Sequence, residues 1–168
     1  MRIVQLLRPE YIQLGLRHGH IDEIDPLKSR EQELSRLKNE VISELAELFG
    51  KNPAIRNCTK FRKDLAERES RGSTAIGDGI ALPHIRSMQP NKAVFVFARS
   101  IDGVWYDAPD GKLVHVFFGV AAPVYDNNST ASFYQFITRS FKEETWLLPA
   151  LLEADTEHEI IRILSQLQ

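Results

Sequence analysis

Apolar residues recur at helical spacing between residues 26 and 49. They follow one another at steps of three, four and seven, as Leu27, Leu34, Leu37, Val41, Leu45 and Leu48. This spacing predicts one apolar face of an α-helix. The pair Asp25-Pro26 suits the start of that helix, because aspartate caps a helix and proline fits its first position. Gly50 marks the end of the helix.

The residues before this helix are less regular. Two short apolar stretches, residues 3–7 and 11–16, suit a strand followed by a turn or a short helix, and the polar run RHGH after them predicts a loop. His18 and His20 in that loop would supply two ligands of a metal site. We expect no metal there, since no further His or Cys lies nearby in the sequence. After the helix, residues 61–69 predict a second, shorter helix.

The pattern changes to that of β-structure in the second half of the chain. The runs AVFVFA at 93–98 and LVHVFFGVA at 113–121 are rich in β-branched and aromatic residues, which predicts two strands buried on both faces. Turn residues on either side of residues 104–106 suggest a shorter strand between them.

Three helices are predicted after these strands. The first follows Asn127, Asn128 and Ser129 and carries Tyr134, Ile137 and Phe141 on one face, the second covers residues 146–152, and the third begins at a capping box, Thr156-x-x-Glu159. Helices at both ends of the chain and strands in its middle predict an α/β fold, a sandwich with a mixed sheet. We see no linker, so residues 1–168 are taken as a single domain.

Composition narrows the class of protein. The 168 residues carry 21 Lys and Arg against 23 Asp and Glu, a net charge of −2, with 43% hydrophobic residues. This balance is typical of a globular domain, and it argues against nucleic acid as the main partner. No apolar run is long enough for membrane insertion and no signal peptide is recognisable, so we expect a cytoplasmic protein. The single cysteine, Cys58, excludes an internal disulfide and is expected to be a small buried side chain.

One central segment, RESRGSTAIGDGIALPHIR at residues 68–86, carries most of the candidate chemistry. It combines three glycines, two hydroxyl residues, an arginine and a histidine that follows a proline: Gly72, Gly77, Gly79, Ser73, Thr74, Arg68 and His84. The spacing fits neither a P-loop nor a dinucleotide-binding loop, because the lysine and the third glycine are missing.

These residue types suit phosphoryl transfer through a histidine. A neutral imidazole is a good nucleophile near pH 7, and the transferred group needs positioning and charge stabilisation. Arg68 would offer a planar fork of donors, and Ser73, Thr74 and the glycine-rich backbone would offer hydroxyl and N–H donors. From spacing alone, however, a structural turn that exposes a histidine is the favoured interpretation.

The same segment closely resembles the active-site signature of the type-2 enzyme IIA domain, the fructose, mannitol and nitrogen-regulatory class of the phosphoenolpyruvate:sugar phosphotransferase system. The shared pattern is an Arg-Glu pair, a Ser-Thr-x-Ile-Gly-x-Gly stretch and an apolar-Pro-His-x-Arg ending. Three further segments resemble those of the family: the N-terminal residues 6–12, the strand at 114–123 and the final helix at 153–167. The resemblance extends over most of the chain outside residues 17–37.

This resemblance implies a three-layer α/β/α sandwich and assigns roles to individual residues. His84 would accept a phosphoryl group from the phosphohistidine of an HPr-type phosphocarrier protein, and Arg68 would neutralise its charge. Ser73, Thr74, Gly77 and Gly79 would bind the phosphate. No metal or other cofactor is implied, since the donor is already a high-energy phosphoramidate.

Two features depart from the family pattern. Members often carry a second histidine early in the helix after the Ala-Ala-Pro strand end, and this chain has none there, so that Ser129 or Ser132 is expected in its place. His115, the other candidate, is expected to be a half-buried strand residue. Residues 17–37 form an atypical N-terminal extension of the first helix, which serves either the core or a partner surface.

The sequence therefore predicts a phosphotransferase-system component, a phosphocarrier. Cys58 lacks a phosphate-binding loop, so a IIB component or a regulated target protein must lie on a separate chain. The acceptor decides between sugar transport and nitrogen-type regulation, and the sequence leaves that choice open. A non-catalytic interaction domain on the same fold is the alternative, and a metal hydrolase using His18, His20 or His115 lacks supporting spacing.

Overall fold

The computed structural model describes residues 5–167, so the start of the first apolar stretch lies outside the described residues. The strands are β1 (Ile12–Gln13), β2 (Ala75–Gly77), β3 (Ile80–Ala81), β4 (His84–Ser87), β5 (Val94–Val104) and β6 (Val114–Pro123). The helices are α1 (Arg30–Gly50), α2 (Cys58–Ser70), α3 (Ser129–Glu143), α4 (Leu147–Glu153) and α5 (Glu157–Leu164). Short 3-10 helices cover Pro9–Tyr11 and Ile21–Glu23.

The strands form one mixed sheet around β6. The order is β1-β5-β6-β3-β2, and β4 pairs with β6 further along the edge that β3 uses. β5 runs antiparallel to β6, whereas β3 and β4 run parallel to it. The mixed sheet predicted from the sequence is confirmed, and β6 is its central strand because it stands in the middle of this order.

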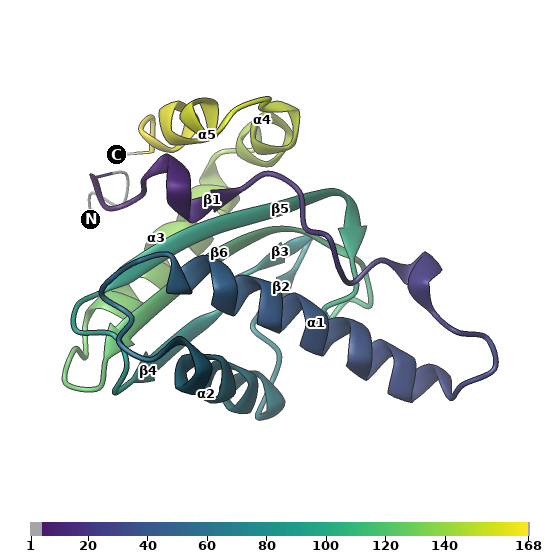
Figure 1. Cartoon of the computed structure of the whole chain (residues 1–168). Helices are drawn as coiled ribbons and strands as arrows, with labels where there is room; N and C mark the ends of the chain where they lie inside the picture. The colour runs from purple at the N-terminus through teal and green to yellow at the C-terminus, as the bar shows by residue number, and fades with distance from the viewer. Residues whose placement is uncertain (1–4, 168) are drawn as a thin grey trace.

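Helices cover both faces of the sheet, as Figure 1 shows. α1 and α2 lie on one face, where the Phe49 and Phe61 rings join them at 5.2 Å between centroids. α3 and α4 lie on the other face, where Phe133 of α3 packs on Phe95 of β5 at 5.1 Å. α5 packs against α4 and the 3-10 helix Pro9–Tyr11. The three-layer α/β/α sandwich is therefore confirmed.

Gly119 in the middle of β6 lets α1 approach the sheet. A Cβ atom at this position would lie 2.6 Å from the Phe49 ring and 2.7 Å from Val96. Distances below about 3 Å do not occur between packed carbon atoms, since optimal contacts lie at roughly 3.5–4.0 Å. The Phe49 side chain therefore occupies the space that any larger residue at 119 would need.

The first helix begins four residues later than its apolar pattern predicts. Helix α1 starts at Arg30, and the Asp25 carboxylate accepts a bond from the Leu27 N–H within a turn instead of capping a helix. The Asp25 N–H in turn donates to the Glu33 carboxylate. Leu27 is 93% exposed, so it does not belong to the buried face. The predicted helical extension is wrong over residues 17–29, which form turns and the 3-10 helix Ile21–Glu23.

Two other local predictions are wrong. Residues 104–106 are not a separate strand, because β5 continues to Val104 through a register shift, with Gly103 at φ +82°. The Trp105 N–H then leaves the sheet and donates to Gly19. Cys58 is exposed and starts α2, with its thiol 3.8 Å from the Gly50 carbonyl oxygen, so it is not a core side chain.

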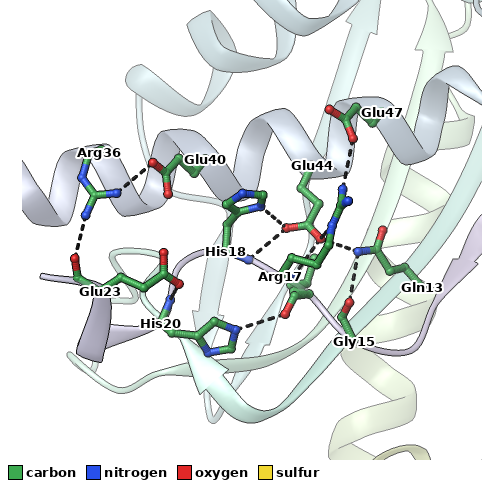
Figure 2. A network of polar contacts seen from close by, with 11 residues as sticks. Gln13, Gly15, Arg17, His18, His20, Glu23, Arg36, Glu40, Glu44 and Glu47 are labelled. Carbon is green, nitrogen blue, oxygen red and sulfur yellow. Dashed lines mark hydrogen bonds and ion pairs between the residues drawn. The ribbon is translucent and has the colours of Figure 1, made fainter.

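The N-terminal segment is tied to α1 by a buried carboxylate (Figure 2). Glu44 accepts bonds from the backbone N–H groups of Arg17 (2.8 Å) and His18 (3.2 Å) and from the side chains of Gln13, Arg17 and His18. Burial alone would raise the pKa of Glu44, but these donors outweigh it and hold the pKa below its usual value. The carboxylate is therefore ionised at neutral pH, and it anchors Gln13, Arg17 and His18 to α1.

We predict that Glu44 makes stability depend on pH. Because its folded pKa is depressed, the stabilisation is complete above the unfolded value of about 4.3 and is lost as the pH falls through the lower folded pKa. Glu44→Gln should lower the free energy of unfolding by about 1–3 kcal/mol at pH 7 and flatten its pH dependence below about pH 5. Urea unfolding between pH 3 and 7 measures both effects.

The matched control is Glu47→Gln on the same helix. Glu47 is exposed and has a single 3.4 Å contact with Arg17, so its loss should change stability by less than about 0.5 kcal/mol. Equal effects of the two substitutions at all pH values would contradict the role assigned to Glu44.

Candidate functional site

The signature segment folds as a helix end, a hairpin and a short strand. Arg68 lies in the last turn of α2, and the chain then runs through β2 and a tight turn into β3. Residues 77–79 all have positive φ values, +94°, +55° and +79°, which two glycines adopt readily. The turn is anchored by the Asp78 N–H, which donates to Asp110. Gly77 and Gly79 thus serve this turn.

Pro83 separates β3 from β4 along the same edge of β6. Ile80 and Ala81 pair with Val116 and Phe117, and pairing resumes when the Val120 N–H donates to the Pro83 carbonyl. His84 is then the first residue of β4 and pairs with Val120. Proline suits the break because it has no N–H to donate to the ladder. The central strand therefore sets the position of His84.

Two contacts select one tautomer of His84. Its Nδ1 atom lies 2.7 Å from the Leu82 carbonyl oxygen, and its Nε2 atom lies 3.1 Å from Nη2 of Arg68. A carbonyl oxygen only accepts and a guanidinium only donates, so Nδ1 carries the proton and Nε2 presents its lone pair. This is the arrangement that a nucleophilic Nε2 requires.

The Arg68 guanidinium is also held by a hydrogen bond to the backbone just after α2. Nη1 donates to the Gly72 carbonyl oxygen at 3.2 Å, while Nη2 faces His84. The arginine therefore links the end of α2 to the start of β4. Its planar fork lies beside the nitrogen at which a phosphoryl group would be attached, where its charge would stabilise anionic oxygens.

His84 and Arg68 line the same groove, which has a volume of about 810 Å³. Further cations on its walls are Lys60, Arg71 and Arg86, the last of which donates to the Asn127 side chain at 2.6 Å. The apolar part of the wall includes Met88 and Val124, both exposed. Asp64 and Glu67 also line the groove, and Glu67 pairs with Arg71 at 2.6 Å, so Arg68 is the cation in direct contact with Nε2.

The other residues predicted to bind phosphate are not part of the groove lining. As far as residues 5–167 show, the lining of the groove does not include Ser73, Thr74, Gly77 or Gly79. The Ser73 hydroxyl donates to the Tyr106 carbonyl oxygen at 3.0 Å. The structure brings Arg68 and His84 together and gives these four residues other contacts, so their role toward phosphate stays a prediction.

A buried polar cluster surrounds Glu69, the residue after Arg68. Glu69 accepts bonds from the hydroxyl and the backbone N–H of Thr74, and Lys38 of α1 lies 3.7 Å from the same carboxylate. Lys38 also lies over the Tyr106 ring, 5.3 Å from its centroid. Burial, together with the Glu69 charge, raises the pKa of Tyr106 well above its ordinary value, so the phenol stays protonated. This cluster attaches the Ser73-Thr74 segment to α2.

The start of α3, where Ser129 or Ser132 is expected in place of a second histidine, lies beside the groove. Neither Ser129 nor Ser132 is among the described residues that line the groove, whereas Thr130 and Ala131 are. The Ser129 hydroxyl donates to Asp126 at 2.5 Å. Sequence reasoning missed Tyr134, whose ring lies 6.0 Å from the His84 ring. It follows Thr130 and Ala131 at helical spacing, which is the signal that would have found it.

The remaining histidines lie away from this groove. His115 is a half-buried residue of β6, as expected, and its Nδ1 atom lies 3.1 Å from the Ile101 carbonyl oxygen. His18 contacts Glu44, and His20 contacts the Leu16 carbonyl oxygen. In the part of the chain that is described, no three His, Cys, Asp or Glu side chains are grouped to hold a metal ion, and no helix has the length and apolar character to cross a membrane.

Fold and site together define a class of α/β/α protein that presents an arginine-backed histidine at the edge of its central strand. The profile of the family "Phosphoenolpyruvate-dependent sugar phosphotransferase system, EIIA 2" matches residues 30–167. The chain belongs to this family, as its signature segment predicts.

Individual relatives agree with this assignment. The chain is 34% identical over 167 residues to the "PTS system fructose-specific EIIABC component" of Bacillus subtilis (strain 168), covering 99% of this chain and 23% of that protein. It is 25% identical over 139 residues to the "Nitrogen regulatory protein" of Klebsiella oxytoca, covering 82% of this chain and 85% of the relative. The chain therefore spans less than a quarter of the length of the fructose relative.

A solved structure shares the fold. The nitrogen regulatory protein IIA-Ntr from Neisseria meningitidis superposes with a TM-score of 0.74 and 24% identity, over 98% of this chain and 99% of that one. This likeness supports the architecture of the sheet and its two helical layers.

We predict that Thr74 acts through Glu69. Thr74→Val removes the hydroxyl donor from a buried carboxylate at nearly constant shape and should lower the free energy of unfolding by about 1–3 kcal/mol, measured by urea denaturation. Thr74→Ser keeps the hydroxyl and should retain most of the stability. A Thr74→Val protein of unchanged stability that accepts phosphate more slowly would instead support the phosphate-binding role.

Proposed function

We propose that this protein is a phosphohistidine carrier whose acceptor atom is Nε2 of His84. The observation that carries the proposal is the pair of contacts on the imidazole, which leaves the Nε2 lone pair facing Arg68 and an open groove. Membership of the EIIA family supports a role in the phosphotransferase system.

The chemistry is an in-line transfer between two imidazoles. The Nε2 lone pair forms the new N–P bond while the N–P bond of the donor's phosphohistidine breaks and returns its electron pair to the donor nitrogen. The His84 ring gains positive charge in this step, and the Leu82 carbonyl stabilises it through the Nδ1 proton. Arg68 then stabilises the phosphoryl oxygens, and no cofactor enters the reaction.

The partners that we propose are proteins. An HPr-type phosphocarrier protein would supply the phosphoryl group, and a cysteine on a separate IIB component would take it, with an S–P bond forming as the N–P bond of His84 breaks. Both steps would take place in the cytoplasm. The fructose-specific relative is named an EIIABC component, and this name supports transfer of the phosphoryl group from a IIA to a IIB component.

A regulatory role is the second candidate function. The likeness to a nitrogen regulatory protein over 85% of that relative's length supports it. In this version phosphorylation of His84 would change the charge of the groove and thereby its affinity for a target protein. A phosphorylated protein that passes no phosphate to IIB components, but whose binding to a target changes, would favour regulation.

We predict that His84 is the phosphorylation site. Incubation with phosphoenolpyruvate, enzyme I and HPr should add one acid-labile phosphate to the wild type, measured by intact mass, and none to His84→Ala. The control is His158→Ala, which changes an exposed histidine of α5 and should accept phosphate like the wild type. Lack of transfer from several HPr proteins would favour the non-catalytic interaction domain, and a phosphorylated His84→Ala would overturn the site.

We predict that Arg68 accelerates the transfer. Arg68→Ala should slow phosphorylation about ten- to hundredfold, the loss expected for one charge-assisted hydrogen bond of about 1.5–3 kcal/mol. Arg68→Lys should recover part of the rate, because it restores the charge without the planar fork. Arg139→Ala removes an exposed arginine paired with Glu143 and should leave the rate unchanged. Quench-flow measurement with phosphorylated HPr gives these rates; equal rates for Arg68→Ala and wild type would remove Arg68 from the mechanism.

A further inference from the structure

Tyr134 of α3 contacts the imidazole of His84, the proposed acceptor. This contact is separate from the hydrogen bonds that His84 makes with Leu82 and Arg68. Its ring centroid lies 6.0 Å from that of His84, with the planes at 73°. This is the edge-to-face geometry that aromatic pairs prefer. The imidazole therefore has two polar contacts, at Nδ1 and Nε2, and one aromatic contact.

The packing of α3 sets the direction of Tyr134. The neighbouring Phe133 is buried against Phe95, and Ile137 is buried one turn later, so these residues hold the helix on the sheet. Successive residues of a helix differ by about 100° in direction, which takes Tyr134 off the buried stripe. Tyr134 was expected on the apolar face with Ile137, but it is 40% exposed and its ring lies beside His84 of β4.

The core does not depend on this side chain. Within residues 5–167 the Tyr134 hydroxyl makes no hydrogen bond, while the Tyr134 backbone carbonyl accepts one from Thr138. The ring is 40% exposed and lies 6.0 Å from the His84 ring, just outside the residues that line the groove. The contact with the imidazole is therefore one that this ring makes from α3 toward β4.

Phosphorylation would make this contact more important. Once Nε2 carries a phosphoryl group, it no longer accepts a bond from Arg68, and the guanidinium turns to the phosphoryl oxygens. The ring then retains the Nδ1 bond to Leu82 and the contact with Tyr134. The second histidine of the family pattern is absent here, and Thr130 and Ala131 beside Tyr134 are small.

We propose that Tyr134 is a positioning residue for the phosphorylated state of His84. Its ring holds the phosphoimidazole in the orientation that faces the groove and covers one flank of the N–P bond against water. The inference rests on the proposed phosphocarrier function and adds to it a residue that acts through its aromatic ring, without proton transfer.

The test measures how long the phosphate stays on His84. The wild type, Tyr134→Phe, Tyr134→Ala and Tyr125→Ala are phosphorylated by phosphoramidate, a small donor that needs no protein docking, and loss of phosphate is followed by intact mass. Tyr125 is the matched control, because it is 74% exposed and its hydroxyl contacts Asn91. Thermal unfolding of each variant reports on the fold.

Tyr134→Ala should lose phosphate about two- to tenfold faster than the wild type, the range expected for one aromatic pair. Tyr134→Phe keeps the ring and should match the wild type, as should Tyr125→Ala. Equal lifetimes for Tyr134→Ala and wild type, or a Phe variant as short-lived as the Ala variant, would overturn this inference and leave the carrier function standing. A wild type that takes no phosphate from either phosphoramidate or HPr would overturn both.

Discussion

Strand β6 pairs along both of its edges, and the geometry of the whole molecule follows from this pairing. Along one edge it accepts the antiparallel strand β5, and along the other it accepts β3 and then β4 in parallel. Both of its faces are apolar, so helices must cover both sides of the sheet. Gly119 lets Phe49 of α1 approach closely on one face, while Phe118 packs on Phe97 and Phe141 on the other.

The same pairing connects the fold to the site. Since β3 and β4 use one edge of β6, the chain between them has to continue along that edge, and Pro83 provides the interruption. The Leu82 carbonyl then meets Nδ1 of the histidine two residues later. A hydrogen bond to the backbone thus places the ring proton on Nδ1 and leaves the lone pair on Nε2. In the function that we propose, α2 adds the counter-charge through Arg68, and α3 adds the aromatic ring of Tyr134.

Patterns that depend on near neighbours predicted much of this structure. The two long strands were recognised from continuous β-branched and aromatic runs, and the final helix from its cap, where the Thr156 hydroxyl accepts from Glu159. The start of α1 was missed because a contact between a side chain and the backbone eight residues earlier decides it: Glu33 accepts from the Asp25 N–H, and Leu27 is left exposed. Hydrophobic spacing does not contain such information.

The candidate site was likewise predicted only in part. The motif pointed to Arg68 and His84, which the fold brings into contact. It did not indicate that the Thr74 hydroxyl would bond Glu69, because that bond depends on how the chain turns back after α2. Tyr134 was missed because its partner, His84 of β4, is 50 positions away in the sequence, and the packing of α3 against the sheet brings the two rings together.

The most direct test of the central claim is to identify the nitrogen that carries phosphorus. Protein labelled with nitrogen-15 at histidine and phosphorylated through HPr would be examined by NMR for phosphorus–nitrogen coupling on the His84 ring. The account predicts coupling to Nε2, with Nδ1 still directed at the Leu82 carbonyl. Phosphorus on Nδ1 of His84, or on a different residue, would contradict it.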